Sequence, residues 1–536
     1  MESPDTEGIV NQAFERALDN NEREVDSRTD QDILESTERT PLITSGALYT
    51  PRDILSSSTT QRSWRNTNSY IARLAYYSNL RLPENALAVP PHVAAQYLVL
   101  PQSQKLKEGG RQSSLVTIFA IWNTMMGTSM LSMAWGLQQS GFILGIGLMI
   151  GMGLVCCYTA NRIVRAQYHA PRGVVIFEFP DICRVFLGKW AETTAGVFGL
   201  LTFFGAMMVY WTLLSTFLLN IGEFIHIQAT TNETIEFLTK DVLCSQSIQA
   251  SGNVTEFEKY WNSKTVPLYL IVLIMPLLNM KDAVVFTKFN SLGTISVAFI
   301  TVLTIVKISL WGVNWSNDPL SVHYVELASV KFPSLMGMLC LAYSIHSAII
   351  TLLKNNARQE NNSRDLAIGF SLVGLTYTFV GTMVFISFPL SKDCIDQNFI
   401  KNLTSYDGMA IIARFFLFLQ MSTVFPLLAF LFRVNFLYVI FKMQDFPGYA
   451  KVIALNLITI GICATIAIVY PNVGDIIGWS GAISGLVYVF LLPCLVNIAI
   501  RKMRRIITPK YYILQYSLIF LGIFILGAKI VTAVTG

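Results

Sequence analysis

The chain has 536 residues, of which 53% are hydrophobic and 14% are charged, and its formal net charge is +5. Soluble proteins average about 25% charged residues, so one globular core cannot hide this many apolar side chains, and an ordinary soluble domain is excluded. The composition favours an all-α polytopic membrane protein with lipid around it. Its basic residues are scattered over the loops, so the net charge gives no reason to expect nucleic-acid binding.

Residues 1–112 are predicted to form a largely disordered cytosolic tail, ahead of a transmembrane transporter domain over residues 113–536. The first forty residues carry twelve acidic and four basic side chains and no apolar periodicity. This acidic start does not fit a secretory signal peptide.

Within the tail, residues 70–95 contain clustered apolar side chains, which predict a docking segment that orders on binding a partner. The alternative is that this segment packs against the cytosolic mouth of its own chain. The predicted docking residues are Leu74, Tyr77, Leu80, Leu87 and Pro90.

A shorter tail motif, ERTPLI, fits the acidic dileucine pattern that directs proteins to lysosomes. Glu38 supplies the acidic position, and Leu42 and Ile43 supply the apolar pair. Such hexamers also arise by chance in disordered tails. We interpret these residues as a sorting signal.

Eleven apolar runs follow, which we interpret as membrane spans, although the fourth is short. They cover residues 115–137, 141–164, 191–225, 267–280, 283–311, 333–353, 366–389, 409–441, 452–470, 474–500 and 511–534. Loops on one side of these runs carry eighteen Lys and Arg residues, and loops on the other side carry six. The positive-inside rule therefore predicts a cytosolic N-terminus and a lumenal C-terminus.

The first apolar run is interrupted at its middle by the polar stretch WNTMMGTS, residues 122–129. A helix that unwinds within the membrane exposes backbone groups, and this is tolerated only where they bind something or line a cavity. The preceding half-helix ends in carbonyls that suit Na⁺ or an ammonium group, and the following half-helix begins with N–H groups that suit a carboxylate. An amino acid needs both. The predicted substrate contacts are Asn123, Thr124, Met125, Met126, Gly127, Thr128 and Ser129.

The sixth run contains a matching interruption, at which Tyr343 and His346 are further predicted substrate contacts. Two interrupted spans in corresponding positions are typical of transporters built from inverted repeats. In the eighth run, the adjacent hydroxyls of Ser422 and Thr423 are predicted to complete a Na⁺ site with the carbonyls of the first span. The alternatives are that these hydroxyls bond to their own helical turn and that the lone histidine is structural.

The predicted lumenal loops carry two kinds of covalent site. Cys244 and Cys394 are the only cysteines in the two long loops of an oxidising compartment, so a disulfide is expected, with two free thiols as the alternative. Four sequons on this side predict glycosylation at Asn232, Asn253, Asn314 and Asn402. A fifth, at Asn361, lies on the cytosolic side and is expected to stay unmodified.

Two lysines, Lys307 and Lys529, lie near the lumenal ends of their spans and are expected to extend their ammonium groups into water.

The stretch SLVTIFAIWNTMMGTSMLSMAWGLQQSGF, residues 114–142, resembles the first span of the amino acid/auxin permease family, and in particular the lysosomal arginine-sensing branch of solute carrier family 38. Supporting stretches are TLLKNNARQENNSRDL, PLSKDCIDQNF and QMSTVFPLL, and the similarity covers residues 113–536.

The resemblance implies a LeuT-like bundle of about eleven transmembrane helices, in two five-span inverted repeats, with helices 1 and 6 broken. It implies substrates of the arginine, leucine and glutamine class, with Asn123 and Thr128 at positions associated with substrate and Na⁺, and Thr423 at the hydroxyl position of the ion site. It also implies that the tail engages the Ragulator complex and the Rag GTPases and signals to the mTOR kinase complex.

The leading hypothesis is therefore a lysosomal amino-acid transporter and sensor. The alternatives are a plasma-membrane Na⁺-coupled neutral amino-acid symporter and a receptor that binds amino acids without transporting them. An enzyme is not expected, because the sequence offers neither a metal-ligand cluster nor a nucleophile with a base, and no organic cofactor is expected beside a possible Na⁺.

Overall fold

The computed structural model describes residues 113–126, 128–171, 179–230, 235–244, 256–279, 292–346, 349–354, 356–441, 448–506 and 508–535. Several residues singled out in the sequence lie outside this part of the chain. They are Glu38, Leu42, Ile43, Leu74, Tyr77, Leu80, Leu87, Pro90, Gly127, Asn232 and Asn253.

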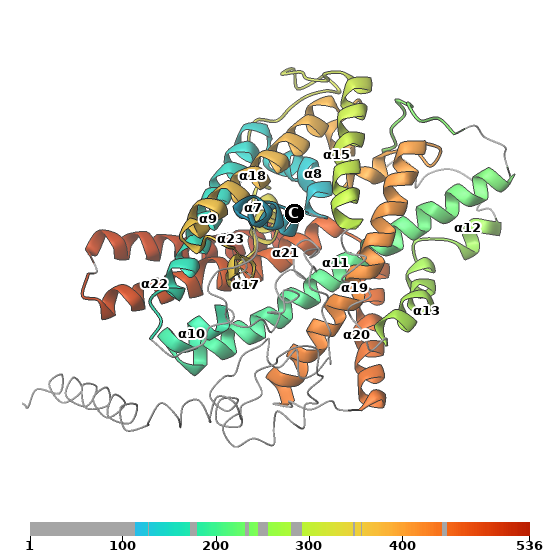
Figure 1. Ribbon diagram of the computed structural model, residues 1–536. Coiled ribbons are helices and arrows are strands. Elements are labelled where there is room, and N and C mark those ends of the chain that lie inside the picture. The colour runs from blue at the N-terminus through green and yellow to red at the C-terminus, as the bar shows by residue number, and fades with distance from the viewer. Residues whose placement is uncertain are drawn as a thin grey trace, which may run out of the picture. The chain divides into compact units, whose positions relative to one another are not determined.

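The described part is helical and contains no strand, only isolated bridges between extended residues. Figure 1 shows helices of very different lengths crossing one another. In the first half of the chain they are α7 (Ser114–Met125), α8 (Ser129–Ser140), α9 (Phe142–Gln167), α10 (Phe179–Leu187), α11 (Lys189–Thr230), α12 (Glu256–Tyr260), α13 (Val266–Leu278) and α15 (Leu292–Trp311).

The second half continues with another series of helices, separated by short helical turns. They are α16 (Pro333–Ala342), α17 (Ile349–Lys354), α18 (Asn362–Ser387), α19 (Gly408–Phe441), α20 (Tyr449–Val469), α21 (Val473–Gly485), α22 (Leu492–Met503) and α23 (Pro509–Thr535). The turns are η2 (Gln359–Asn361), η3 (Lys392–Cys394), η4 (Phe399–Asn402) and the π-helical η5 (Leu486–Leu491), which joins α21 to α22.

Seven helical segments of the described chain are long and apolar enough to cross a membrane. They are Phe142–Gln167, Lys189–Thr230, Gln359–Ser387, Gly408–Phe441, Tyr449–Val469, Val473–Met503 and Pro509–Val534. The pair α7 and α8 makes an eighth if it is counted as one bent span. Shorter apolar segments lie in α13, α15 and α16. The chain is therefore a multi-pass membrane protein.

Helices α16 and α21 meet along a seam of glycines, which we call the glycine seam: Gly337, Gly478, Gly481 and Gly485. All ten residues of α16 are buried. A Cβ added to Gly481 would overlap the carbonyl oxygen of Gly337, and one added to Gly337 would overlap that of Gly478. Without side chains in between, the two backbones touch, as small residues allow in membrane helix pairs.

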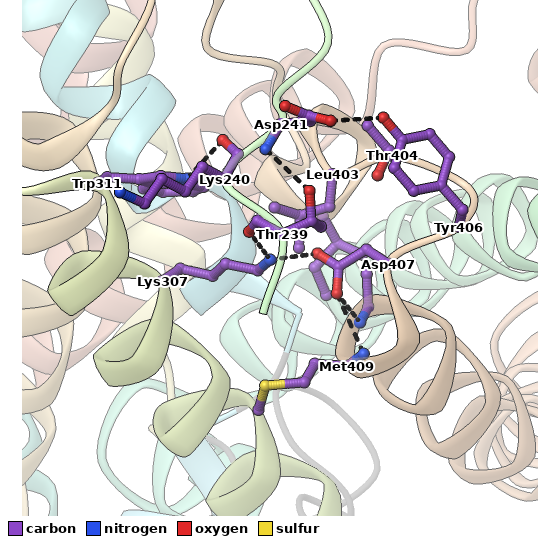
Figure 2. A network of polar contacts seen from close by, with 12 residues as sticks. Thr239, Lys240, Asp241, Lys307, Trp311, Leu403, Thr404, Tyr406, Asp407 and Met409 are labelled. Atoms are coloured by element: carbon purple, nitrogen blue, oxygen red, sulfur yellow. Dashed lines mark hydrogen bonds and ion pairs between the residues drawn. The ribbon is translucent and has the colours of Figure 1, made fainter. Parts of the chain in front are cut away.

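An extended segment, residues 235–244, ties three parts of the bundle together, and we call it the strap (Figure 2). It ends at Cys244, which forms a disulfide with Cys394 in the connection from α18 to α19. The Leu243 amide donates to the Asn402 carbonyl at 2.7 Å, and the Trp311 indole donates to the Lys240 carbonyl at 3.2 Å.

The strap also covers a buried ion pair, which corrects the expectation that Lys307 reaches water. Lys307 is 1% exposed, forms an ion pair with Asp407 and donates to the Thr239 carbonyl at 2.8 Å (Figure 2). The other carboxylate oxygen of Asp407 accepts the amides of Met409 and Ala410, at the start of α19. One aspartate thus caps a helix and neutralises a lysine.

The expectation for Lys529 is wrong for a similar reason. Its side chain is buried, and its Nζ lies 3.0 Å from both the Asp475 carboxylate on α21 and the Ser334 hydroxyl on α16. Charged groups that cannot reach water are retained in a protein when they are paired and hydrogen-bonded. This contact joins α23 to the two helices of the glycine seam.

The structure contradicts glycosylation at Asn402. This side chain is 1% exposed, and its Nδ2, the atom that would carry the glycan, donates to the carbonyls of Leu243 at 2.8 Å and Cys394 at 2.7 Å. Asn314 is half-buried, and its Nδ2 likewise donates to two carbonyls, of Ser387 and Trp311. A sugar on either nitrogen would remove one of these bonds.

Candidate substrate site at two broken helices

The first candidate element is the break between α7 and α8, where the helix axis turns by 60°. α7 ends at Met125, because Met126 adopts an extended backbone while its amide still donates to the Trp122 carbonyl at 2.9 Å. α8 begins at Ser129 after Thr128, whose side chain forms no capping hydrogen bond. The Thr128 hydroxyl therefore does not cap α8.

The side chains at this first break are mostly out of solvent. Thr124, Met125, Met126, Thr128 and Ser129 are buried, and Asn123 is half-buried. Thr124 donates its hydroxyl to the Ala120 carbonyl at 2.6 Å, one turn back. The predicted site residues thus gather at one helix break, although Thr124 is committed to its own helix.

The second candidate element is the break between α16 and α17. α16 ends at Ala342, and the amides of Tyr343 and Ser344 still donate to carbonyls one turn back. Tyr343 and His346 are both fully buried. The Tyr343 hydroxyl donates to the Met149 carbonyl on α9 at 3.1 Å, so it braces the break against α9.

His346 is held by Thr159 on α9, with 2.8 Å between Nε2 and the hydroxyl oxygen. The Thr159 hydroxyl oxygen also lies 3.1 Å from the carbonyls of Val155 and Cys156, so this hydroxyl joins the ring to the preceding turn of α9. The other ring nitrogen, Nδ1, is buried and has no hydrogen-bond partner. The ring is therefore held against α9, and Nδ1 makes no hydrogen bond.

Tyr377, in the middle of α18, connects the two breaks and was not found from the sequence. Its hydroxyl donates to the carbonyl of Met125, the last residue of α7, and lies 3.4 Å from the carbonyl of Ala342, the last residue of α16. Its ring packs edge-on against Tyr343 at 5.5 Å between centroids. The carbonyl ends of both broken helices therefore point at one side chain.

The predicted sodium ligands on α19 are not joined to the break by hydrogen bonds. Thr423 donates its hydroxyl to the Gln420 carbonyl at 2.7 Å, which is the back-bonded alternative. The Ser422 hydroxyl oxygen is buried and has no partner. A hydroxyl oxygen without a partner fits a hard cation such as Na⁺, whose ligands are oxygens.

The chemistry available at the two breaks is that of carbonyls, amides, hydroxyls and one imidazole. Within the described ranges no group of three or more His, Cys, Asp or Glu side chains is placed to hold a metal ion. Such a site suits a small polar ligand that brings its own positive and negative charges, and the helix ends supply the complementary partial charges.

Comparison with known proteins identifies the family of the chain. A family model described as transmembrane amino acid transporter protein matches residues 110–535. The chain is 41% identical over 488 residues to neutral amino acid transporter 9 of Rattus norvegicus, covering 84% of this chain and 87% of the relative. It is 37% identical over 528 residues to the sodium-coupled neutral amino acid transporter 9 homolog of Caenorhabditis elegans, covering 92% and 86%.

A more distant relative is solute carrier family 38 member 8 of Homo sapiens, 23% identical over 258 residues. The family model spans both broken helices and every described helix between them. From the polar interruption of the first span, the buried meeting of two helix ends and these matches together, the chain is a member of the transmembrane amino acid transporter family.

Proposed function

We propose that the protein moves amino acids across a membrane by alternating access, and that the substrate binds between the two broken helices. The observation that carries this proposal is the convergence of the carbonyl ends of α7 and α16 on Tyr377, beside the start of α8. An α-carboxylate fits the N–H groups at the start of α8, and an α-ammonium group fits the carbonyls. We further propose that the helices form a LeuT-like bundle of eleven spans in two inverted repeats.

The proposed substrates are amino acids of the arginine, leucine and glutamine class, with Na⁺ as the coupling ion. Asn123, Thr128, Ser422 and Thr423 are the proposed ion ligands. The partner-free hydroxyl of Ser422 supports the ion site, and the printed name of the Caenorhabditis elegans relative includes sodium coupling. Carbonyls and hydroxyls in place of carboxylates suit a binding step that is easily reversed, because no buried charge holds the cation.

Uptake by purified protein in liposomes tests the transport proposal. Labelled leucine and arginine should accumulate more than in empty liposomes, and the initial rate should rise when an inward Na⁺ gradient replaces choline. Parallel vesicles with a pH gradient and no Na⁺ separate proton coupling from sodium coupling. Saturable binding without accumulation in any of these conditions would favour the receptor over the transporter.

A second proposal concerns the cell. We propose a lysosomal location and a role as an arginine sensor that reports to the Ragulator–Rag GTPase and mTOR pathway. The dileucine hexamer at Glu38, Leu42 and Ile43 and the apolar cluster at residues 70–95 support it over a plasma-membrane symporter. On this proposal the strap and the disulfide face the lumen, where oxidation is possible.

We expect a peptide covering residues 60–112 to retain the Ragulator–Rag assembly in a pull-down without the membrane domain. Tyr77→Ala or Leu80→Ala should weaken retention more than tenfold, because a docking motif concentrates its binding free energy in a few apolar side chains. Glu38→Ala in the full-length protein is the control: it should alter delivery to lysosomes and leave retention of the assembly by the full-length protein unchanged. Retention by the full-length protein alone would show that the tail is not sufficient.

A further inference from the structure

Tyr377 lies where both broken helices end, and its hydroxyl is the only side-chain group of the described chain seen to bond to both ends. Met125 and Ala342 are the last residues of α7 and α16, so their carbonyls have no N–H partner within their own helices. Tyr377 is 0% exposed, and water therefore does not reach these carbonyls from its side. The tyrosine hydroxyl is the side-chain group that both carbonyls share.

A single hydroxyl is a poor partner for two carbonyls. It has one proton, which it donates to the Met125 carbonyl. The Ala342 carbonyl, at 3.4 Å, is left with a long and weak contact. Each carbonyl also carries the partial negative charge of a helix C-terminus. The arrangement therefore suits a group with a positive charge and several donors better than it suits a neutral phenol.

We propose that the Tyr377 hydroxyl holds the place of the substrate's α-ammonium group in the empty site and gives up the Met125 carbonyl when substrate binds. This inference rests on the proposed function, in which the substrate is an amino acid. Tyr377 is then a positioning residue: it keeps the carbonyl ends satisfied without ligand and sets how much affinity an ammonium group gains there. The exchange breaks one neutral hydrogen bond and forms charge-assisted ones.

The surroundings of Tyr377 support the proposal that its hydroxyl can be replaced by an ammonium group at the Met125 carbonyl. Its ring is held edge-on by Tyr343, which is itself braced on the Met149 carbonyl, so the ring is fixed while the hydroxyl faces the two helix ends. The helical backbone stops directly after each of the two carbonyls, at Met126 and at Tyr343, so neither carbonyl is enclosed by a further turn of its own helix.

The test is Tyr377→Phe in purified full-length protein, with binding of labelled L-leucine and L-arginine measured at fixed Na⁺. Removing the hydroxyl leaves the carbonyls unsatisfied only in the empty state, so the Kd for both amino acids should fall about three- to tenfold. The melting temperature should fall in the empty protein, and the difference from the parent should close at saturating leucine. In competition assays, Tyr377→Phe and the parent should have the same affinity for 4-methylpentanoate, which is leucine without its amine.

Tyr488→Phe is the matched control, because the Tyr488 hydroxyl is also buried and donates to a backbone carbonyl, that of Ala195, at 2.6 Å. It should lower the melting temperature equally with and without leucine and leave the Kd unchanged. The same behaviour in Tyr377→Phe would overturn the proposal, and so would a higher Kd, which would make the hydroxyl a direct ligand contact.

Measuring Na⁺ binding as well distinguishes the two cations that the carbonyl ends could bind, Na⁺ and the substrate's ammonium group. If Tyr377→Phe tightens Na⁺ binding while the leucine Kd in choline is unchanged, the hydroxyl stands in for sodium and the ammonium assignment is wrong. A parent protein that binds no amino acid would instead refute the proposed function, independently of Tyr377.

Discussion

Thr128→Trp is expected to abolish amino-acid binding. Thr128 is 4% exposed and stands at the start of α8, where the indole would occupy the space that the proposed carboxylate needs. Thr128→Val, which keeps the shape and removes the hydroxyl, should raise the Kd about ten- to a hundredfold, because a hydrogen bond to a charged group contributes roughly 1.5–3 kcal/mol. Binding of labelled arginine and leucine to purified protein measures both effects.

Thr128→Ser is the control for the hydroxyl and should bind within a few-fold of the parent protein. The tryptophan variant must elute as a single monodisperse species, so that lost binding is not lost folding. Unchanged binding in a well-folded Thr128→Trp variant would place the substrate elsewhere.

Lys307→Met is expected to cost about 3–5 kcal/mol of stability, because it leaves Asp407 buried, charged and without its partner. Both side chains are almost fully buried, at 1% and 0% exposed, and the strap covers them. The melting temperature in detergent should fall sharply. The loss also removes the donor to the Thr239 carbonyl, so the strap should become the first region to lose protection in hydrogen exchange.

Two further variants separate the buried charge from the packing. Lys307→Met combined with Asp407→Asn should recover most of the loss, since the amide is neutral and its oxygen still caps α19. Arg364→Met removes the pair with Asp365 at 2.9 Å, but Arg364 is 58% exposed and the buried Asp365 carboxylate still accepts from the Asn356 amide at 2.9 Å, so a smaller loss than for Lys307→Met is expected. Equal effects of Lys307→Met and Arg364→Met would show that burial of the lysine adds nothing to this ion pair.

The break in the first span was predictable from sequence, because several polar residues and a glycine are clustered at the middle of an apolar run. The structure ends α7 at Met125 and starts α8 at Ser129, within the polar stretch. The second break was predictable in the same way at Tyr343 and His346. Each apolar run also overlaps a described helix, because long apolar helices can be recognised in a sequence by their length and hydropathy.

Tyr377 was not predictable, because nothing near it in sequence marks it. It sits within a continuous apolar helix, and its partners are main-chain carbonyls 252 and 35 residues away. Every residue has a carbonyl, so sequence carries no sign of which ones converge. The two lysines were misjudged for a related reason: each span was treated alone, whereas their acidic partners Asp407 and Asp475 belong to other segments. The sequence did offer a signal for these ion pairs: in each pair, a basic and an acidic residue lie near the predicted lumenal ends of different apolar runs.

The glycine seam has a mechanical consequence. Since Gly337, Gly478 and Gly481 bring two backbones into contact, α16 cannot slide along α21 without main-chain atoms colliding. Lys529 on α23 bonds to Ser334 on α16 and to Asp475 on α21, so we expect the three helices to move together. If these three helices move together, the proposed sixth span bends at the irregular residues after Ala342, which lie beside the proposed substrate site.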